Sequence, residues 1–309
     1  MGSDAHLIVV GGPAGLLDQA RHRVDELERR WSRFIETSEI SRLNRMAGTF
    51  IEVSADTVTL VERATEAWRL SGGAFDPTVL GAVIHAGYDR SFDLLETPGP
   101  AVPGGFPVGQ PGSRPPLGLG ASDILIDGGS VRLPSGTGFD PGGIGKGLAA
   151  DLVCDEMMSA GAEGACISLG GDVRVSGTGP GGQVWTVDVE HPDATHPIAR
   201  LGLAGGAVAT STTLRRRWML GGTPRHHLID PQTGLPSETD LTHATVIAAQ
   251  AWVAEVLAKA VLLAGSAHPF DIVGGTGAEA LVVDRDGRVQ ATAGVVGFLG
   301  TARMPARIT

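Results

Sequence analysis

Residues 140–147 read DPGGIGKG, and an apolar segment with helical spacing follows them directly. Four glycines around one lysine leave a run of backbone N–H groups uncovered, and the helix start adds unpaired donors and a positive dipole end. Such a segment suits an anion such as a phosphate or a diphosphate. It is not a P-loop, because Gly147 stands where that motif needs a hydroxyl and Asp140 stands where it needs a glycine.

The composition predicts a cytoplasmic protein with a large core. The chain has 309 residues, and 34 Asp and Glu outweigh 24 Lys and Arg to give a net charge of −10. That balance argues against a general nucleic-acid or membrane-surface partner. No apolar run reaches membrane-spanning length, and the N-terminus has no signal-peptide pattern. Cys154 and Cys166 lie in apolar segments without metal spacing, so we expect reduced thiols.

Hydrophobic periodicity predicts helices and strands in alternation along the chain. We expect helices at residues 17–34, 55–70, 144–157 and 250–263, and strands at 7–10, 124–126, 131–133, 165–169, 184–189, 241–248, 279–283 and 289–292. This pattern favours an α+β fold with mixed β-sheets packed against helices, as one domain over residues 1–309. Residues 96–120 are rich in Pro and Gly, so we expect a mobile loop there.

Four further segments have both a structural and a functional interpretation. Residues 71–78 (SGGAFDPT) fit a helix C-cap and turn, or a loop that offers an aromatic ring and a carboxylate. Residues 170–172 fit a strand-end turn or a ligand loop. Residues 226–234 join two histidines to a turn that begins at Asp230, as a solvated loop or the place of a general base. Residues 215–217 are three arginines, typical of a solvated face or of a diphosphate counter-charge.

Taken together, these segments resemble one family, the FAD:protein FMN transferases (ApbE family). The resemblance runs from Met1 to about Gly265, and it rests on six segments in the right order: residues 38–44, 74–78, 140–147, 169–172, 209–211 and 227–234. It implies an α+β fold of T-fold-like architecture, with FAD bound in a cleft. Because the match begins at Met1, the resemblance also implies a variant without the leader that many relatives carry.

The resemblance implies a role for particular residues. The positions that match the family's FAD contacts are Met1, Ala74, Phe75, Asp76, Asp140, Lys146 and Ile229. Phe34 falls where relatives often place an aromatic side chain near the flavin ring. His227 matches the proposed catalytic histidine, and Asp230 is expected to help orient its loop. Asp140 is expected to accept a hydrogen bond from a ring N–H, and Lys146 to hold the diphosphate.

The chain departs from the family pattern where Mg²⁺ is expected. The family's ligands are a backbone oxygen, matching Gly143, and an Asp and a Thr in an A-D-x-x-x-T run. That run is AEVLAK here, so Glu255 replaces the Asp and Lys259 replaces the Thr. A protonated lysine cannot bind Mg²⁺ and repels it. Without the family context, Glu255 and Lys259 fit a surface i,i+4 salt bridge.

Two functions therefore stay open, with a third less favoured. The first is an enzyme that transfers the FMN half of FAD to a Thr or Ser of an acceptor flavoprotein and releases AMP, with Mg²⁺ held by Gly143 and Glu255. The second is a non-catalytic protein that binds or sequesters FAD, in which Lys259 replaces Mg²⁺ and joins the FAD contacts. The third is a pyrophosphatase that splits FAD with water. FAD is the expected ligand in each case, with neither nucleic acid nor membrane as a partner.

Overall fold

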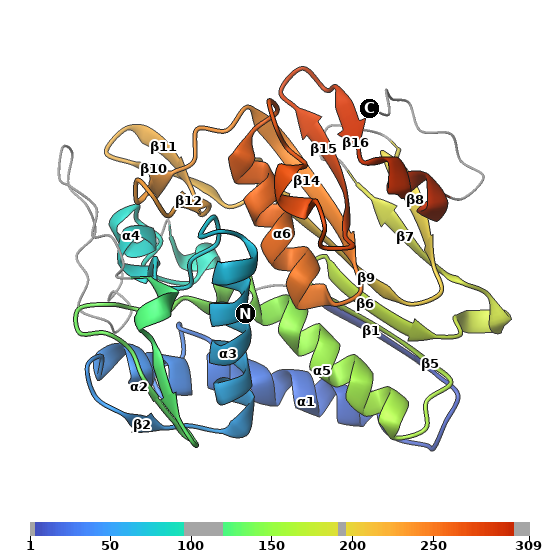
Figure 1. Cartoon of the computed structure of the whole chain (residues 1–309). Coiled ribbons are helices and arrows are strands. Elements are labelled where there is room, and N and C mark those ends of the chain that lie inside the picture. Colours follow the sequence, from blue (N-terminus) through green and yellow to red (C-terminus); the bar gives the residue numbers. More distant parts are fainter. Residues whose placement is uncertain (1–3, 96–119, 191–195, 300–309) are drawn as a thin grey trace. The chain divides into compact units, whose positions relative to one another are not determined.

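A computed structural model describes residues 4–95, 120–190 and 196–299 (Figure 1). The described chain divides into two compact units, described separately below. The first unit holds residues 26–95, 120–145 and 215–238, and the second holds residues 4–25, 146–190, 196–214 and 239–299. The single domain over residues 1–309 stays a prediction. The predicted loop at 96–120 lies outside the described residues except for Gly120.

The second unit is built on a seven-stranded sheet. Its strands, in spatial order, are β1 (Ala5–Val10), β5 (Gly164–Leu169), β6 (Asp172–Gly177), β9 (Gly206–Thr212), β14 (Leu241–Ala248), β15 (Glu279–Asp284) and β16 (Val289–Ala291). Every neighbouring pair is antiparallel. Gly170 and Gly171, with φ of 61° and 93°, form the turn between β5 and β6, so the turn interpretation of this segment is confirmed.

Two helices of the second unit, α5 (Gly145–Ser159, from Lys146 onward) and α6 (Ala251–Ala264), approach each other closely (Figure 1). The helix α6 packs on β9 and β14 and is buried almost all round. Its first backbone N–H groups have no partner within the helix, so Asp151 of α5 accepts from Ala251 at 2.8 Å and Trp252 at 2.9 Å. Burial raises the pKa of Asp151 to about 6, against the effect of these two bonds.

A smaller ladder extends the core of the second unit. The antiparallel strands β7 (Trp185–Val189) and β8 (Ala199–Leu203) carry Trp185, Leu201 and Leu203 into one apolar cluster with residues of β6, β9, β14 and β15. Burial of this apolar surface is the main stabilising contribution here. The 3₁₀ helices of this unit are η4 (Pro180–Gly182), η5 (Asp271–Val273) and η6 (Ala293–Phe298).

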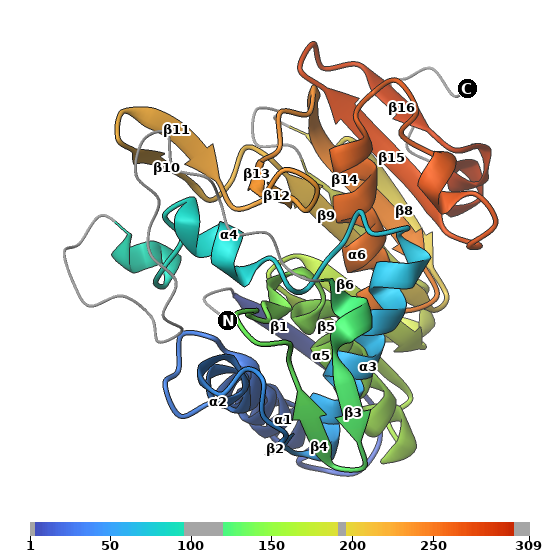
Figure 2. The ribbon, with the colours of Figure 1, turned by 60° about the vertical axis from the view of Figure 1, so that its left-hand side comes forward.

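The first unit combines helices with short strands. Its helices are α2 (Glu39–Arg45), α3 (Ala55–Leu70), α4 (Leu80–His85), η1 (Phe92–Leu94), η2 (Ala121–Asp123) and η3 (Pro141–Gly143), together with the end of α1 (Leu16–Trp31). Its strands form a three-stranded sheet of β2 (Ile51–Glu52), β4 (Ser130–Arg132) and β3 (Leu125–Asp127), and the pairs β10 (Arg217–Leu220) with β11 (Thr223–His226) and β12 (Ile229–Asp230) with β13 (Leu235–Pro236). Figure 2 shows the β10–β11 hairpin beside α4.

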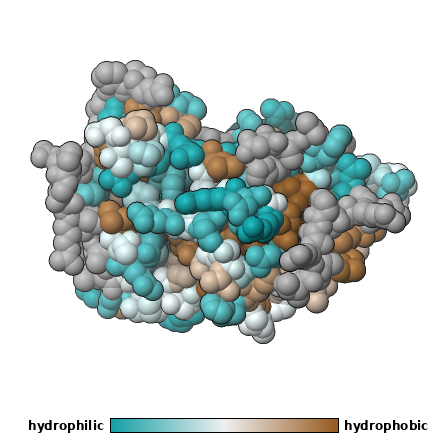
Figure 3. Space-filling view, turned by 90° about the horizontal axis from the view of Figure 1, so that it is seen from above, coloured by the Kyte–Doolittle hydropathy of each residue, from teal (hydrophilic) through white to brown (hydrophobic). Residues whose placement is uncertain are grey.

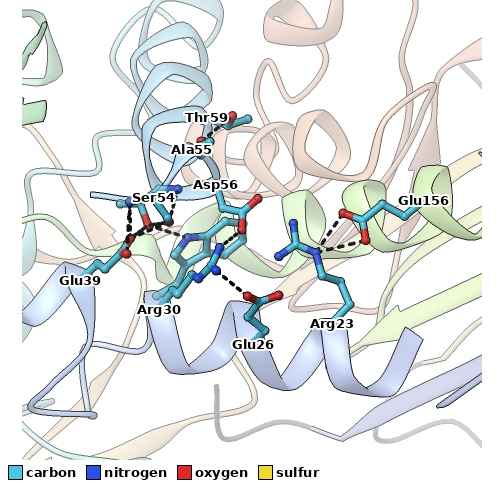
Figure 4. A network of polar contacts seen from close by, with 11 residues as sticks. Arg23, Glu26, Arg30, Glu39, Ser54, Ala55, Asp56, Thr59 and Glu156 are labelled. Carbon is cyan, nitrogen blue, oxygen red and sulfur yellow. Dashed lines mark hydrogen bonds and ion pairs between the residues drawn. The ribbon is translucent and has the colours of Figure 1, made fainter. Parts of the chain in front are cut away.

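Side-chain caps fix the starts of α2 and α3 in the first unit, and Figure 4 shows Ser54 at the start of α3. Ser38 caps α2 by accepting from Ser41 N, and Ser54 caps α3 by accepting from Thr57 N. The Glu39 carboxylate accepts hydrogen bonds from the backbone N and the hydroxyl of Ser54, at 3.2 and 2.8 Å. The segment at residues 38–44 therefore ties α2 to the start of α3.

Several predicted elements match the structure, and others were missed. The helix at residues 55–70 and the strand at 241–248 have the predicted bounds. The segment 71–78 begins with the C-cap Ser71, followed by Gly72 and Gly73 at φ of 58° and 85°, so its interpretation as a cap and turn is confirmed. The strands β6 and β9 of the main sheet were not predicted, and neither were α2, α4 and the hairpins of the first unit.

The surface carries isolated apolar side chains among polar ones. The face drawn in Figure 3 shows brown residues lying between teal ones. Exposed large apolar residues such as Met219 and Val184 are scattered along the described chain, which is normal for a folded surface. Across the described residues, every helix is too short or too polar to span a membrane.

We predict that Gly147→Ala destabilises the protein, whereas Gly145→Ala does not. A Cβ at Gly147 would lie 2.4 Å from Ala251 O and 2.7 Å from Trp252 N, which are backbone atoms that cannot move aside. Overpacking of this kind costs about 1–3 kcal/mol. A Cβ at Gly145 meets only Pro141 Cβ at 3.4 Å. Urea unfolding of both variants measures the difference, and equal midpoints would contradict the close approach of α5 and α6.

Candidate functional site

Asp140 lies at the start of the glycine-rich segment in the first unit. Its backbone N donates to Pro77 O at 2.7 Å, which joins this segment to the turn at residues 74–78. Its side chain caps η3, with Oδ1 accepting from Gly142 N at 2.9 Å. Two of the predicted segments therefore meet at Asp140, and its carboxylate is held in a defined position.

Asn44 fixes the backbone directly before Asp140. Its Nδ2 donates to Phe139 O at 3.0 Å, and its Oδ1 accepts from Phe139 N at 2.7 Å. Both groups are buried, where an unmade hydrogen bond is costly. Asn44 closes the segment at residues 38–44, so this third segment also acts on the position of Asp140.

Arg33 is the buried cation beside Asp140. Its side chain is 4% exposed, and its Nε lies 3.6 Å from Asp140 Oδ1. Its Nη2 donates to Tyr88 O at 3.0 Å, and its guanidinium stacks on Phe34 at 4.2 Å and on Tyr88 at 4.7 Å. Its Nη1 is buried and has no hydrogen-bond partner among the described residues.

Aromatic side chains surround this guanidinium. The ring of Tyr88 lies 5.8 Å from that of Phe34 and 5.5 Å from that of Trp218, and Trp218 Nε1 donates to Ala86 O at 2.8 Å. Ile229 belongs to the same apolar cluster. Burial raises the pKa of Tyr88, with Arg216 and Arg33 opposing the shift. Arg216 is the one described non-glycine residue with positive φ, at 51°.

The turn after α3 places Ala74, Phe75 and Asp76. Asp76 Oδ1 accepts from the N and the hydroxyl of Thr78, at 2.8 and 2.6 Å. Burial raises the pKa of Asp76, although these two bonds oppose the shift. Phe75 is buried, and Ala74 is partly exposed.

The histidine segment lies between the two hairpins of the first unit. His226 Nε2 lies 2.9 Å from Ser237 O, and burial lowers the pKa of His226. His227 is partly buried in the bend that follows β11. Asp230 holds the β12–β13 turn, because its carboxylate accepts from Gln232 N at 2.9 Å and from the Thr233 hydroxyl at 3.1 Å. This geometry makes Asp230 a turn-forming residue.

The second unit contains a buried cluster of charges around Glu255, whose side chain is 1% exposed. Lys146 Nζ donates to Glu255 Oε1 at 2.5 Å and also to Asp172 Oδ2. Gly147 N donates to Glu255 Oε2 at 2.8 Å. Burial alone would lower the pKa of Lys146, but Asp172 and Glu255 outweigh it and raise that pKa.

Lys259 completes this cluster. Its Nζ lies 3.3 Å from Glu255 Oε1, and its side chain is 16% exposed. Burial lowers the pKa of Lys259, with Glu255 acting against the shift. Burial would raise the pKa of Glu255, but Lys146, Lys259 and the Gly147 N–H outweigh it and lower that pKa. The prediction of a surface salt bridge between Glu255 and Lys259 is therefore wrong. The two side chains belong to a largely buried network that also contains Lys146 and Asp172.

These residues do not fit a magnesium ion at Glu255. Mg²⁺ requires oxygen ligands in octahedral geometry. Here Glu255 Oε1 accepts from two ammonium groups and Oε2 accepts from a backbone N–H. Two positive charges already balance Glu255 and Asp172. Among the described residues, no group of three or more His, Cys, Asp or Glu side chains is arranged to hold a metal ion.

The predicted site residues fall into two groups. The first unit brings together Phe34, Asp140 and Ile229 around Arg33 and Tyr88. The turn that contains Ala74, Phe75 and Asp76 is hydrogen-bonded to the backbone of Asp140 through Pro77. The same unit also contains Gly143, His227 and Asp230. The second unit brings together Lys146, Glu255 and Lys259. Met1 lies outside the described residues. The roles assigned to all these residues stay predictions.

Sequence reasoning missed the residues that support these groups. Arg33, Tyr88 and Trp218 carry no motif, and a lone arginine beside Phe34 gives no signal of burial. Asn44 and Asp172 lie within segments 38–44 and 169–172, but their partners are 95 and 26 residues away in the sequence. One signal was present: Lys146 and Lys259 are the only lysines of the whole chain, whose other 22 basic residues are arginines.

Comparison with known proteins identifies the family. The model of the ApbE family matches residues 1–282, which is most of the chain. The chain therefore belongs to the ApbE family.

Individual relatives agree with this assignment. The chain is 29% identical to the FAD:protein FMN transferase of Treponema pallidum over 84% of its length and 75% of that relative. It is 27% identical to the protein of the same name from Vibrio cholerae, over 78% and 71%. Its fold is similar to the ApbE protein of Thermotoga maritima (TM-score 0.79, 24% identity, 96% and 100% covered) and to the flavinyl transferase ApbE of Pseudomonas stutzeri (TM-score 0.80, 23% identity, 98% and 95% covered). These two similarities show the α+β fold, which confirms the predicted fold class, although the main sheet is antiparallel throughout and not mixed.

We predict that Asn44→Asp destabilises the protein by about 1–3 kcal/mol, because Phe139 O loses its donor while the side-chain shape is kept. Met46→Ala is the control, since Met46 is exposed at the end of the same helix and its loss should change stability by at most about 0.5 kcal/mol. Denaturant unfolding compares the two variants. Equal stability would show that the bonds between Asn44 and Phe139 contribute nothing.

Proposed function

We propose that this protein is a FAD:protein FMN transferase, which moves the FMN half of FAD onto a Thr or Ser hydroxyl of an acceptor flavoprotein and releases AMP. The relatives from Treponema pallidum and Vibrio cholerae support the proposal, since each aligns with more than three quarters of the chain. A cytoplasmic location is part of the same proposal.

The observation that carries the proposal is the buried Arg33 beside Asp140. A buried guanidinium with an unpartnered Nη1 offers a donor, and the neighbouring carboxylate offers an acceptor. FAD has two heteroaromatic ring systems whose edges carry both kinds of group, and the partly exposed ring of Phe34, which the buried ring of Tyr88 supports, supplies an aromatic surface. We assign ring recognition to these four residues, with Ala74, Phe75, Asp76 and Ile229 as further FAD contacts.

The chemistry is a phosphoryl-type transfer. The acceptor oxygen forms a new bond to the phosphorus of FMN, the P–O bond of the diphosphate bridge breaks, and AMP leaves with the bridging oxygen. The hydroxyl proton must be taken up, and His227 is the base that we assign to it. Asp230 acts on this step indirectly, because its carboxylate holds the turn that follows. The diphosphate also needs positive charge nearby.

The two alternatives differ from this proposal in their products. A FAD-sequestering protein leaves FAD intact, and a pyrophosphatase forms FMN and AMP with water as the acceptor. The contact between Lys259 and Glu255 is compatible with both transfer and sequestration, so the products decide between them.

We predict that FAD stabilises the protein and is consumed only when an acceptor is present. FAD at about a hundred times its Kd should stabilise the fold by about 2.7 kcal/mol, measured as a rise in melting temperature. With a candidate acceptor flavoprotein, AMP should form in step with an acceptor whose mass increases by one FMN. Intact FAD after prolonged incubation would favour sequestration, and AMP formed without acceptor would favour the pyrophosphatase.

We predict that Asp140→Asn weakens FAD binding at least about tenfold and destabilises the fold, because Arg33 then lacks its buried counter-charge. The double variant Arg33→Gln with Asp140→Asn removes both charges, so it should recover part of the lost stability without recovering FAD affinity. Asp127→Asn on the exposed strand β3 is the control. Calorimetric FAD titration and thermal unfolding separate the two effects. Wild-type affinity in the folded double variant would contradict the assignment.

A further inference from the structure

Both lysines of this chain converge on one buried carboxylate. Lys146 Nζ lies 2.5 Å and Lys259 Nζ 3.3 Å from the same atom, Glu255 Oε1, and no third lysine occurs in the 309 residues. We propose that these two ammonium groups take the place of a divalent cation in this protein, so that it binds FAD and transfers FMN without Mg²⁺. The substrate in this inference, FAD, is taken from the proposed function. The geometry on which the inference rests lies entirely within the second unit.

The choice of lysine over arginine supports the proposal. This chain uses arginine for its other 22 basic residues, including the buried Arg33 and the partly buried Arg174. A guanidinium is broad, planar and spreads its charge, whereas an ammonium is a compact, strongly hydrated point charge. The ammonium is therefore the side-chain group that most resembles a small metal ion, and this chain uses it only in this cluster.

The hydrogen bonds of Glu255 give a second, independent reason. An ionised carboxylate has about four lone-pair positions, and three of them are taken by Lys146, Lys259 and Gly147 N. A divalent ion at Glu255 would have to displace an ammonium and then lie beside it. Because Asp172 and Glu255 are balanced by the two lysines, the cluster has no negative charge left to attract such an ion.

The exposure of the lysines gives them access to an anionic ligand. Glu255 and Asp172 are 1% and 5% exposed, whereas Lys146 and Lys259 are 14% and 16% exposed. The two carboxylates are therefore the most deeply buried members of the cluster, and the exposure that remains belongs to the two lysine side chains. A diphosphate that meets this surface meets positive charge first, as it would at a bound metal.

The first experiment uses the wild-type protein in EDTA and in 5 mM Mg²⁺ or Mn²⁺, a range in which about millimolar sites are filled. We expect the ions alone to leave the melting temperature unchanged, and the FAD affinity and AMP release to be the same in both buffers. FAD binding or AMP release that needs Mg²⁺ would overturn the inference while leaving the proposed function intact. If FAD changes the melting temperature in neither buffer, the proposed function is wrong. If Mn²⁺ without FAD raises the melting temperature, the protein has a metal site and the inference is wrong, whether or not FAD binds.

The second experiment restores the family pattern with Glu255→Asp and Lys259→Thr together. We expect this double variant to bind Mn²⁺ at least about tenfold more tightly than wild type, measured by the EPR signal of free Mn²⁺. The matched control is Glu156→Asp with Arg23→Thr, which removes a Glu–Arg ion pair elsewhere in the second unit and should gain no metal affinity (Figure 4). Equal Mn²⁺ affinity in the two double variants would count against the replacement.

Lys259→Arg covers the case in which the double variant does not fold. It keeps the charge but broadens it, so we expect at least about a tenfold loss of FAD affinity with little change in melting temperature. Wild-type FAD affinity in Lys259→Arg would show that a compact ammonium is not required and would overturn the proposal.

Discussion

The second unit depends on keeping the Glu255 carboxylate charged while it is buried. An isolated carboxylate cannot lose its water without a large cost, so it must gain partners that replace that water. Those partners are Lys146 and Gly147 N at the start of α5 and Lys259 one turn further along α6, while Asp172 at the start of β6 shares the ammonium group of Lys146. Glu255 therefore constrains the start of α5 through Lys146 and Gly147 N. The close approach of Ala251 and Trp252 leaves no room for a side chain at Gly147.

A similar constraint operates in the first unit, with a cation at its centre. Arg33 is buried against Phe34 and Tyr88, and Asp140 supplies its counter-charge. Asn44 holds Phe139 from the other side by two hydrogen bonds. Segments that look unrelated in the sequence therefore share one physical task, which is to hold the carboxylate of residue 140 in place beside a guanidinium.

The sequence predicted what depends on local pattern and missed what depends on distant contacts. Periodicity predicted α3 and β14 because each is long and has a consistent apolar pattern. It missed β6, whose glycine-flanked residues 172–177 become a strand only because β5 and β9 pair with them. The segments around Asp140 and Lys146 were predicted as ligand-binding. The pairing of Lys146 with Glu255 was not, because 109 residues separate the two.

The two departures from the family pattern are best understood as a single change. A lysine at position 259 beside a bound divalent ion would be repelled, and a lysine without a carboxylate partner would be a buried uncompensated charge. A glutamate at position 255 has one methylene more than the aspartate it replaces, and its carboxylate here contacts Lys146, Lys259 and Gly147 N together. The Glu255 carboxylate and the Lys259 ammonium each neutralise the other, so neither is a buried uncompensated charge. Their joint presence therefore supports the proposal that two ammonium groups stand in place of a divalent ion in this protein.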